Sequence, residues 1–312
     1  MDLGKIKHSH LLIRGLNLHI AQIGTGELGT VVFLHGFPEI WYTWRHQMLA
    51  VADAGFRAIA PDFRGYGLSD QPPEPEKGSF DDLVDDLLGI LDSLGAPKAF
   101  LVGKDFGAFP AYDFAVKHPD RVQGVVNLGV PYSPMGYNLE SLPEGFYIHR
   151  WRESGRAEAD FGRISAKTVV RNVYILFSKS EIPIAAEGQE IMDLADPSAP
   201  LPPWFTEEDL EVYGGLYEKS GFRFPLQIPY RTLLERLPAV DPMICRPTLL
   251  IMGEKDYVIK FPGMEEYVRS DLPKSFVADL EIKFLPEGSH FVHEQHPAEV
   301  NALLLGFLER HT

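Results

Sequence analysis

Short apolar runs alternate with segments of helical periodicity along most of the chain. Mainly apolar segments that predict strands lie at residues 30–34, 56–60, 99–102, 122–130, 248–252 and 282–285. Strands that are apolar on both faces are typical of a parallel sheet covered by helices. The alternation therefore predicts an α/β fold, with a mostly parallel sheet, right-handed crossovers and helices on both faces.

Amphipathic helices are predicted at residues 80–94 and 300–308, where apolar side chains recur at helical spacing. In the first helix, Ser79 and the aspartate three residues later are expected to form the N-terminal cap. Its polar face is expected to be solvated and holds Asp81, Asp82, Asp85 and Asp86.

The alternation of strands and helices breaks down between about residues 133 and 237, a segment rich in arginine, glutamate and aromatic residues. About 100 residues are enough for a small helical domain inserted after a core strand. We therefore expect residues 1–133 and 238–312 to form the two parts of one α/β core, and residues 134–237 to form a helical cap or lid.

Composition narrows the range of partners and compartments. The formal charge of −15 argues against nucleic acid and anionic membranes as partners. Hydrophobic residues make up 45% of the chain and aromatic residues 12%, which favours a large core and an apolar pocket. The single cysteine, Cys245, excludes an internal disulfide and fits a reducing compartment. With no signal-peptide pattern and no apolar stretch of transmembrane length, we expect a cytoplasmic protein.

The most informative motif is G-K-D-F-G at residues 103–107, directly after the apolar run at 99–102. Its pattern resembles the strand-to-helix elbow that exposes a nucleophile above a parallel sheet, with Asp105 in place of the usual serine. A carboxylate that attacks a saturated carbon forms an ester, which a base-activated water can hydrolyse. Asp105 therefore indicates attack on an epoxide or an alkyl halide, although the same residue types also suit an ordinary solvated turn.

Hydrolysis of such an ester needs a general base and an acidic residue that orients it. The fold allows the order nucleophile, acid, histidine along the chain. Asp256 follows a predicted strand as the acid should, and His290 follows the last predicted strand as the base should. Asp105, Asp256 and His290 are therefore predicted to form a catalytic triad.

Other residues could fill two of these roles. His293 and His296 are competing bases, but they lie near the start of the last helix, where surface histidines are common. Glu254 is a minor alternative for the acid. Asn127 marks the other place where this fold can keep its acid, and it carries no carboxylate.

Ester hydrolysis passes through a tetrahedral oxyanion, which two backbone N–H groups should stabilise. The expected donors are the residue after the nucleophile, Phe106, and a residue in the loop after the strand at 30–34, Phe37. The Phe37–Pro38 bond is a candidate cis peptide.

The motifs HGFPEIWYTWRHQ at residues 35–47 and DFRGYGLSD at residues 62–70 carry a family resemblance. They resemble plant-type soluble epoxide hydrolases of the α/β-hydrolase superfamily, and the likeness extends over nearly the whole chain, including the cap. The resemblance implies an α/β-hydrolase fold and hydrolysis of a small apolar epoxide to a vicinal diol through a covalent aspartyl ester. That chemistry needs no cofactor and no metal. The chain is expected to be a monomer or a homodimer.

The resemblance also implies two cap tyrosines that bind and protonate the epoxide oxygen. Tyr147, in the run YIHRW, and Tyr230, in the run PYRTL, match these positions, and Tyr174 is their main rival. A phenol is a suitable proton donor to an alkoxide in a dry pocket. Residues that could line that pocket, or could belong to the plain core, are Trp41, Phe109 and Trp151.

The chain departs from the family pattern at Lys104, where relatives usually carry histidine before the nucleophile. A buried ammonium at this position would lower the pKa of Asp105 or pair with another carboxylate. Alternatively, the side chain points away from the pocket and is packed or solvated. Two other functions stay open. A dehalogenase needs halide-binding donors that Phe106 does not supply, and a ligand receptor of the same fold would bind without turnover.

Overall fold

The structure is a computed structural model that describes residues 2–233 and 241–312. Within these residues, eight strands form one sheet in the order β1-β2-β4-β3-β5-β6-β7-β8. Their bounds are β1 (Lys7–Ile13), β2 (Leu16–Ile23), β3 (Thr30–Leu34), β4 (Arg57–Pro61), β5 (Ala99–Lys104), β6 (Val122–Leu128), β7 (Thr248–Gly253) and β8 (Leu280–Leu285). The strands from β3 to β8 are parallel, and β1 and β2 pair antiparallel at one edge.

The strand order reverses direction at β3, which lies between β4 on one side and β5 on the other. In open α/β sheets, ligands bind outside the carboxyl ends of the strands at such a switch point. The loops that follow β3 and β5 are therefore the expected place for a functional site.

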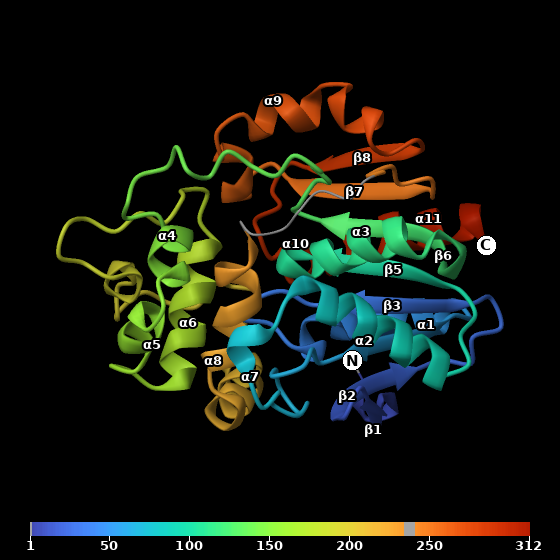
Figure 1. Ribbon diagram of the computed structural model, residues 1–312, viewed down its shortest axis with the longest axis horizontal. Coiled ribbons are helices and arrows are strands. Elements are labelled where there is room, and N and C mark those ends of the chain that lie inside the picture. The colour runs from blue at the N-terminus through green and yellow to red at the C-terminus, as the bar shows by residue number, and fades with distance from the viewer. Residues whose placement is uncertain (1, 234–240) are drawn as a thin grey trace.

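Helices cover both faces of the sheet (Figure 1). α2 (Phe80–Ser93) packs against α3 (Ala108–Lys117) on one face, and α1 (Arg45–Asp53) packs against α11 (Pro297–His311) on the other. α9 (Met264–Arg269) lies beyond the β8 edge, and α10 (Val292–Gln295) precedes α11. The α/β architecture predicted from the apolar pattern is therefore confirmed.

Between β6 and β7 the chain forms a group of helices beyond the carboxyl ends of the strands (Figure 1). They are α4 (Tyr147–Arg152), α5 (Arg156–Phe161), α6 (Ala166–Phe177), α7 (Glu207–Ser220) and α8 (Arg223–Leu226). The division into a cap at residues 134–237 and a core on either side stays a prediction, and its second boundary lies outside the described residues. No helix of the described chain is long and apolar enough to span a membrane.

The sequence predicted the parallel strands and the amphipathic helices well. The six predicted strands are β3 to β8, with bounds that differ by at most two residues, and the two predicted amphipathic helices are α2 and α11. The N–H group of Ser79 donates to Asp82 Oδ2 at 3.0 Å, as expected of the cap. The prediction that the polar face of α2 is solvated was wrong at one position. Asp86 is buried, and its carboxylate accepts two hydrogen bonds from Arg64.

Candidate active site

Asp105 lies in a sharp turn between β5 and α3, at the switch point of the sheet. Its φ is 53°, in the left-handed region that aspartate and asparagine tolerate better than most residues. A Cβ added at Gly103 would lie 2.3 Å from Asn127 Oδ1, and one at Gly107 would lie 2.2 Å from the carbonyl oxygen of Leu34. Both flanking glycines are therefore required by the close packing of the elbow.

The structure brings the three residues of the predicted triad together. His290 Nε2 lies 3.1 Å from Asp105 Oδ2, and His290 Nδ1 lies 3.1 Å from both carboxylate oxygens of Asp256. The N–H group of Val258 donates to Asp256 Oδ1 at 3.0 Å and fixes that carboxylate. All three side chains are buried, and Asp105 is 7% exposed. The histidine can thus accept a proton on the side that faces Asp105 while Asp256 orients its ring.

The loop after β3 supplies a hydrogen-bond donor to the Asp105 carboxylate. The N–H group of Phe37 donates to Asp105 Oδ1 at 3.0 Å, and the Phe37–Pro38 peptide bond is cis. Phe106 follows Asp105 in the same turn, and its ring packs against Tyr230 with centroids 5.1 Å apart. The Phe37 amide therefore already points at the carboxyl group on which an oxyanion would develop.

The surroundings lower the pKa of Asp105 and raise the pKa of His290. Burial raises the pKa of Asp105, but the hydrogen bond from His290 and the charge of Lys104 hold it below its usual value. Burial and the charge of Lys104 lower the pKa of His290, but the charge of Asp256 and the hydrogen bonds to both carboxylates raise it above its usual value. The ionised form of Asp105 is therefore favoured, and His290 binds a proton readily while Asp105 stays charged.

Tyr147 and Tyr230 both lie close to this centre. Tyr147 begins α4, Tyr230 lies in the helical turn Gln227–Arg231, and their ring centroids are 6.3 Å apart. The Tyr147 hydroxyl lies 3.2 Å from that of Tyr257, whose ring centroid is 4.9 Å from that of His290. Burial, reinforced by the nearby charge of Asp105, raises the pKa of both tyrosines. Both phenols are therefore protonated and able to donate.

Tyr257 was missed by the sequence reasoning. It hydrogen-bonds Tyr147 and packs against His290, and so it joins α4 to the predicted triad. Its position next to Asp256 was the available signal.

A small cavity of about 30 Å³ is lined by Asp105. Apart from Asp105, its lining consists of aromatic and aliphatic side chains. The aromatic members are Phe106, Phe109, Tyr137, Tyr147, Tyr257 and Phe261. Such a lining suits an apolar ligand.

The three predicted pocket residues lie at different positions relative to this cavity. Phe109 lines the cavity. Trp151 is buried beside it, with its ring centroid 5.1 Å from Tyr230. Trp41 lies away from the cavity lining and packs its ring against His8 at the antiparallel edge of the sheet.

The rival residues point elsewhere. His293 is buried, contrary to the expected surface position, and its Nε2 atom lies 2.6 Å from Thr43 Oγ1. His296 is partly exposed and lies beside Glu299. The hydroxyl group of Tyr174 donates to Glu294 Oε1 at 2.8 Å.

Neither Glu254 nor the alternative acid position at Asn127 contacts the histidine ring. Glu254 is exposed and pairs with Arg269 at 3.1 Å. Asn127 packs against the elbow at Gly103, and its side-chain N–H group donates to Ala108. Among the described candidates, Asp256 is the one whose carboxylate contacts His290.

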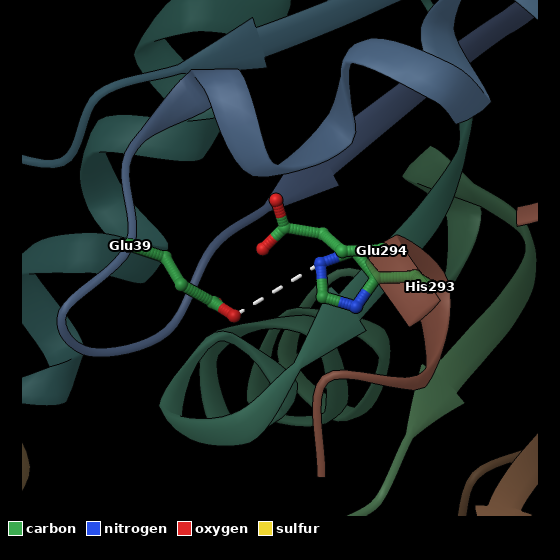
Figure 2. Close-up of side chains that lie close together, drawn as sticks. All are labelled: Glu39, His293 and Glu294. Atoms are coloured by element: carbon green, nitrogen blue, oxygen red, sulfur yellow. Dashed lines mark ion pairs between the residues drawn. The ribbon is translucent and has the colours of Figure 1, made fainter. Parts of the chain in front are cut away.

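A second group of buried charges lies next to the elbow. Figure 2 shows Glu39, from the loop after β3, close to His293 and Glu294 of α10. One ring nitrogen of His293 and one carboxylate oxygen of each glutamate lie within 4.8 Å of one another. Lys104 Nζ lies 2.8 Å from Glu39 Oε1, and Arg45 Nη1 lies 2.5 Å from Glu294 Oε2. The chain's own cations neutralise these carboxylates, so a metal ion would have to displace them.

Comparisons with known proteins show the family to which the chain belongs. The family model described as alpha/beta hydrolase fold matches residues 29–297. The chain is 39% identical to epoxide hydrolase 1 of Siraitia grosvenorii, over 98% of this chain and 99% of the relative. It is 32% identical to epoxide hydrolase A of Mycobacterium tuberculosis, over 94% of each chain.

Solved structures show the same likeness. The structure of potato (Solanum tuberosum) epoxide hydrolase I is similar with a TM-score of 0.89 and 34% identity, and the match covers 98% of this chain and 100% of the potato chain. The family model and the full-length relatives together establish the family. The chain belongs to the epoxide hydrolases of the alpha/beta hydrolase fold family.

Proposed function

We propose that this protein hydrolyses an apolar epoxide to a vicinal diol through a covalent ester of Asp105. The observation that carries the proposal is the position of the Asp105 carboxylate. It is held between the Phe37 amide and His290, at the base of an aromatic cavity that Tyr147 also lines.

In the first step, a carboxylate oxygen of Asp105 attacks a ring carbon, and the carbon–oxygen bond of the epoxide breaks. The ring oxygen takes a proton from the phenol of Tyr147 or Tyr230. Both phenols have a pKa raised by burial, so they enter the step protonated. The products are an ester of Asp105 with a neighbouring hydroxyl group, and a phenolate.

In the second step, His290 takes a proton from water, and the resulting hydroxide attacks the ester carbonyl carbon of Asp105. The amides of Phe37 and Phe106 stabilise the oxyanion. The intermediate collapses to a carboxylic acid and an alkoxide, which takes the proton from His290 to give the diol. The carboxyl proton left on Asp105 restores the phenol, so one water is consumed.

Formation of the ester prepares His290 for its role. In the free enzyme, the hydrogen bond to ionised Asp105 helps to raise the pKa of His290. Esterification removes that charge, while burial and the charge of Lys104 continue to lower the pKa and Asp256 continues to raise it. The pKa of His290 should therefore fall when the ester forms, which favours the neutral imidazole that the second step needs.

The origin of the oxygen atoms tests the proposal. With enzyme in excess over trans-stilbene oxide or a fatty-acid epoxide in ¹⁸O-water, the first turnover should give a diol without ¹⁸O, because its new oxygen comes from Asp105. The peptide that contains Asp105 should gain ¹⁸O, as mass spectrometry would show. A diol labelled in the first turnover would instead mean direct attack by water, and absence of diol from a panel of epoxides would refute the activity.

Replacing the cap tyrosines by phenylalanine should slow opening of the ring. We expect Tyr147→Phe and Tyr230→Phe each to lower kcat/KM by about 10²–10³, the usual cost of losing one donor to a developing oxyanion. The rate of ester formation in a single turnover is the measurement. Tyr174→Phe is the matched control and should retain activity, because its hydroxyl contacts Glu294. Full activity in the double variant Tyr147→Phe/Tyr230→Phe would contradict the assignment.

A further inference from the structure

Lys104 lies at the end of β5 with its side chain fully buried. Its Nζ atom lies 2.8 Å from Glu39 Oε1 and 4.2 Å from the ring centroid of Phe291. Of the two possibilities that the sequence left open, the structure supports a buried ammonium paired with a second carboxylate. A buried ammonium needs such a partner, because the loss of hydration is otherwise very costly.

Glu39 is held in place from a second side. Its Oε2 atom accepts the N–H group of Gly36 at 2.7 Å, in the loop that carries the Phe37 amide. Burial raises the pKa of Glu39, and the charge of Lys104 opposes that rise. The two side chains therefore stabilise each other's charged forms, and Lys104 presents a positive charge at a fixed place.

That charge is separated from the catalytic base by one aromatic ring. Phe291, under the Lys104 ammonium, also contacts the His290 imidazole, with ring centroids 5.3 Å apart. A phenyl ring carries little polarity to screen the interaction, so the positive charge of Lys104 opposes a positive charge on His290. This repulsion is one cause that lowers the pKa of His290.

The other charged and titratable groups near Lys104 and His290 come from several elements. They are Glu39, Arg45, Asp105, Tyr147, Tyr174, Asp209, Tyr213, Asp256, Tyr257, His293 and Glu294. Arg45 is paired with Glu294 and Asp209. Asp256 is the acidic group that contacts His290 besides the nucleophile. Once Asp105 is esterified, Asp256 is therefore the main group that opposes the effect of Lys104 on the protonation of His290.

We propose that Lys104 is a positioning residue of the hydrolysis step. Its buried charge, held by Glu39, disfavours the imidazolium form of His290 and so keeps this side chain available as the base at neutral and mildly acidic pH. The catalytic consequence rests on the proposed function, whereas the effect on His290 does not.

The first measurement needs no substrate. The imidazole of His290 is followed by NMR titration in histidine-labelled protein, with its signal assigned by its loss in His290→Gln. In Lys104→Met, titration should move to higher pH, and Lys104→Arg should restore it. The double variant Lys104→Met/Glu39→Gln, called the neutral pair, leaves no unpaired buried charge. It replaces Lys104→Met in this titration if the single variant fails to fold. Lys117→Met removes a partly exposed lysine that pairs with Asp81, and it should leave the titration unchanged.

The second measurement is the pH dependence of ester hydrolysis in a single turnover. The acidic limb should move to higher pH in Lys104→Met and in the neutral pair, with about three- to tenfold slower hydrolysis at about pH 6 and a smaller change on the alkaline side. A lower melting temperature with an unmoved His290 titration would show a structural role only and overturn the proposal. If the unmodified protein forms no diol, the proposed function fails, while the NMR titration still decides the role of Lys104.

Discussion

Asp105→Asn is expected to lower diol formation by roughly 10⁴-fold or more, as loss of a nucleophile typically does. The amide oxygen carries no negative charge, so it cannot form the ester at a useful rate. Asparagine also adopts the left-handed backbone found at position 105, where φ is 53°, so the elbow should keep its shape. Diol formation from trans-stilbene oxide is the measurement, with the melting temperature as a check of folding.

The matched control is Asp92→Asn on the exposed side of α2, where the carboxylate pairs with Arg121. That variant should keep its activity. Asp105→Ala should be inactive as well, and it excludes slow recovery of a carboxylate by hydrolysis of the amide. Substantial turnover by both Asp105 variants would mean that another group attacks the epoxide.

The site was predictable because its members follow parallel strands. Asp105, Asp256 and His290 come after β5, β7 and β8, whose carboxyl ends meet at one edge of the sheet. The chain order of nucleophile, acid and base then limited the choice to few residues. Strands β3 to β7 were found for a related reason, since burial on both faces leaves a mainly apolar run in the sequence.

The antiparallel edge was not predicted. β1 carries the sequence KHSHLLI, in which only Ile13 is fully buried, so neither an apolar run nor a clear alternation marks it. The turn to β2 uses Arg14 and Gly15, both with positive φ, and an arginine gives no turn signal there. Edge strands that face solvent leave a weak pattern.

The burial and the ion-pair partners of single charged residues could not be predicted without the tertiary structure. Lys104 and Asp86 are buried because Glu39 and Arg64, from distant parts of the chain, pair with them. His293 is buried because α10 turns it toward Thr43. Periodicity places a side chain on a face of its own element, but it does not show which opposite charge another element brings to that face.

His290→Gln should separate the two chemical steps. Ring opening needs the Asp105 carboxylate and a phenol, so the ester should still form in this variant. Glutamine has nearly the size of histidine and can donate to Asp256, but it cannot take a proton from water at neutral pH. Hydrolysis should therefore slow by about 10²–10⁴, the usual contribution of a general base. The ester should then accumulate to one equivalent per protein.

Intact-protein mass spectrometry would detect this species as an increase equal to the mass of the epoxide, and digestion should place it on the peptide that contains Asp105. The control is His296→Gln, which changes the partly exposed rival histidine and should turn over without accumulating an adduct. Asp105→Asn/His290→Gln should form no adduct, because the carboxylate is gone. Rapid turnover by His290→Gln without an adduct would show that another group activates the water. His290 contacts both carboxylates at 3.1 Å, and an adduct confined to its variant would tie that geometry to the second step.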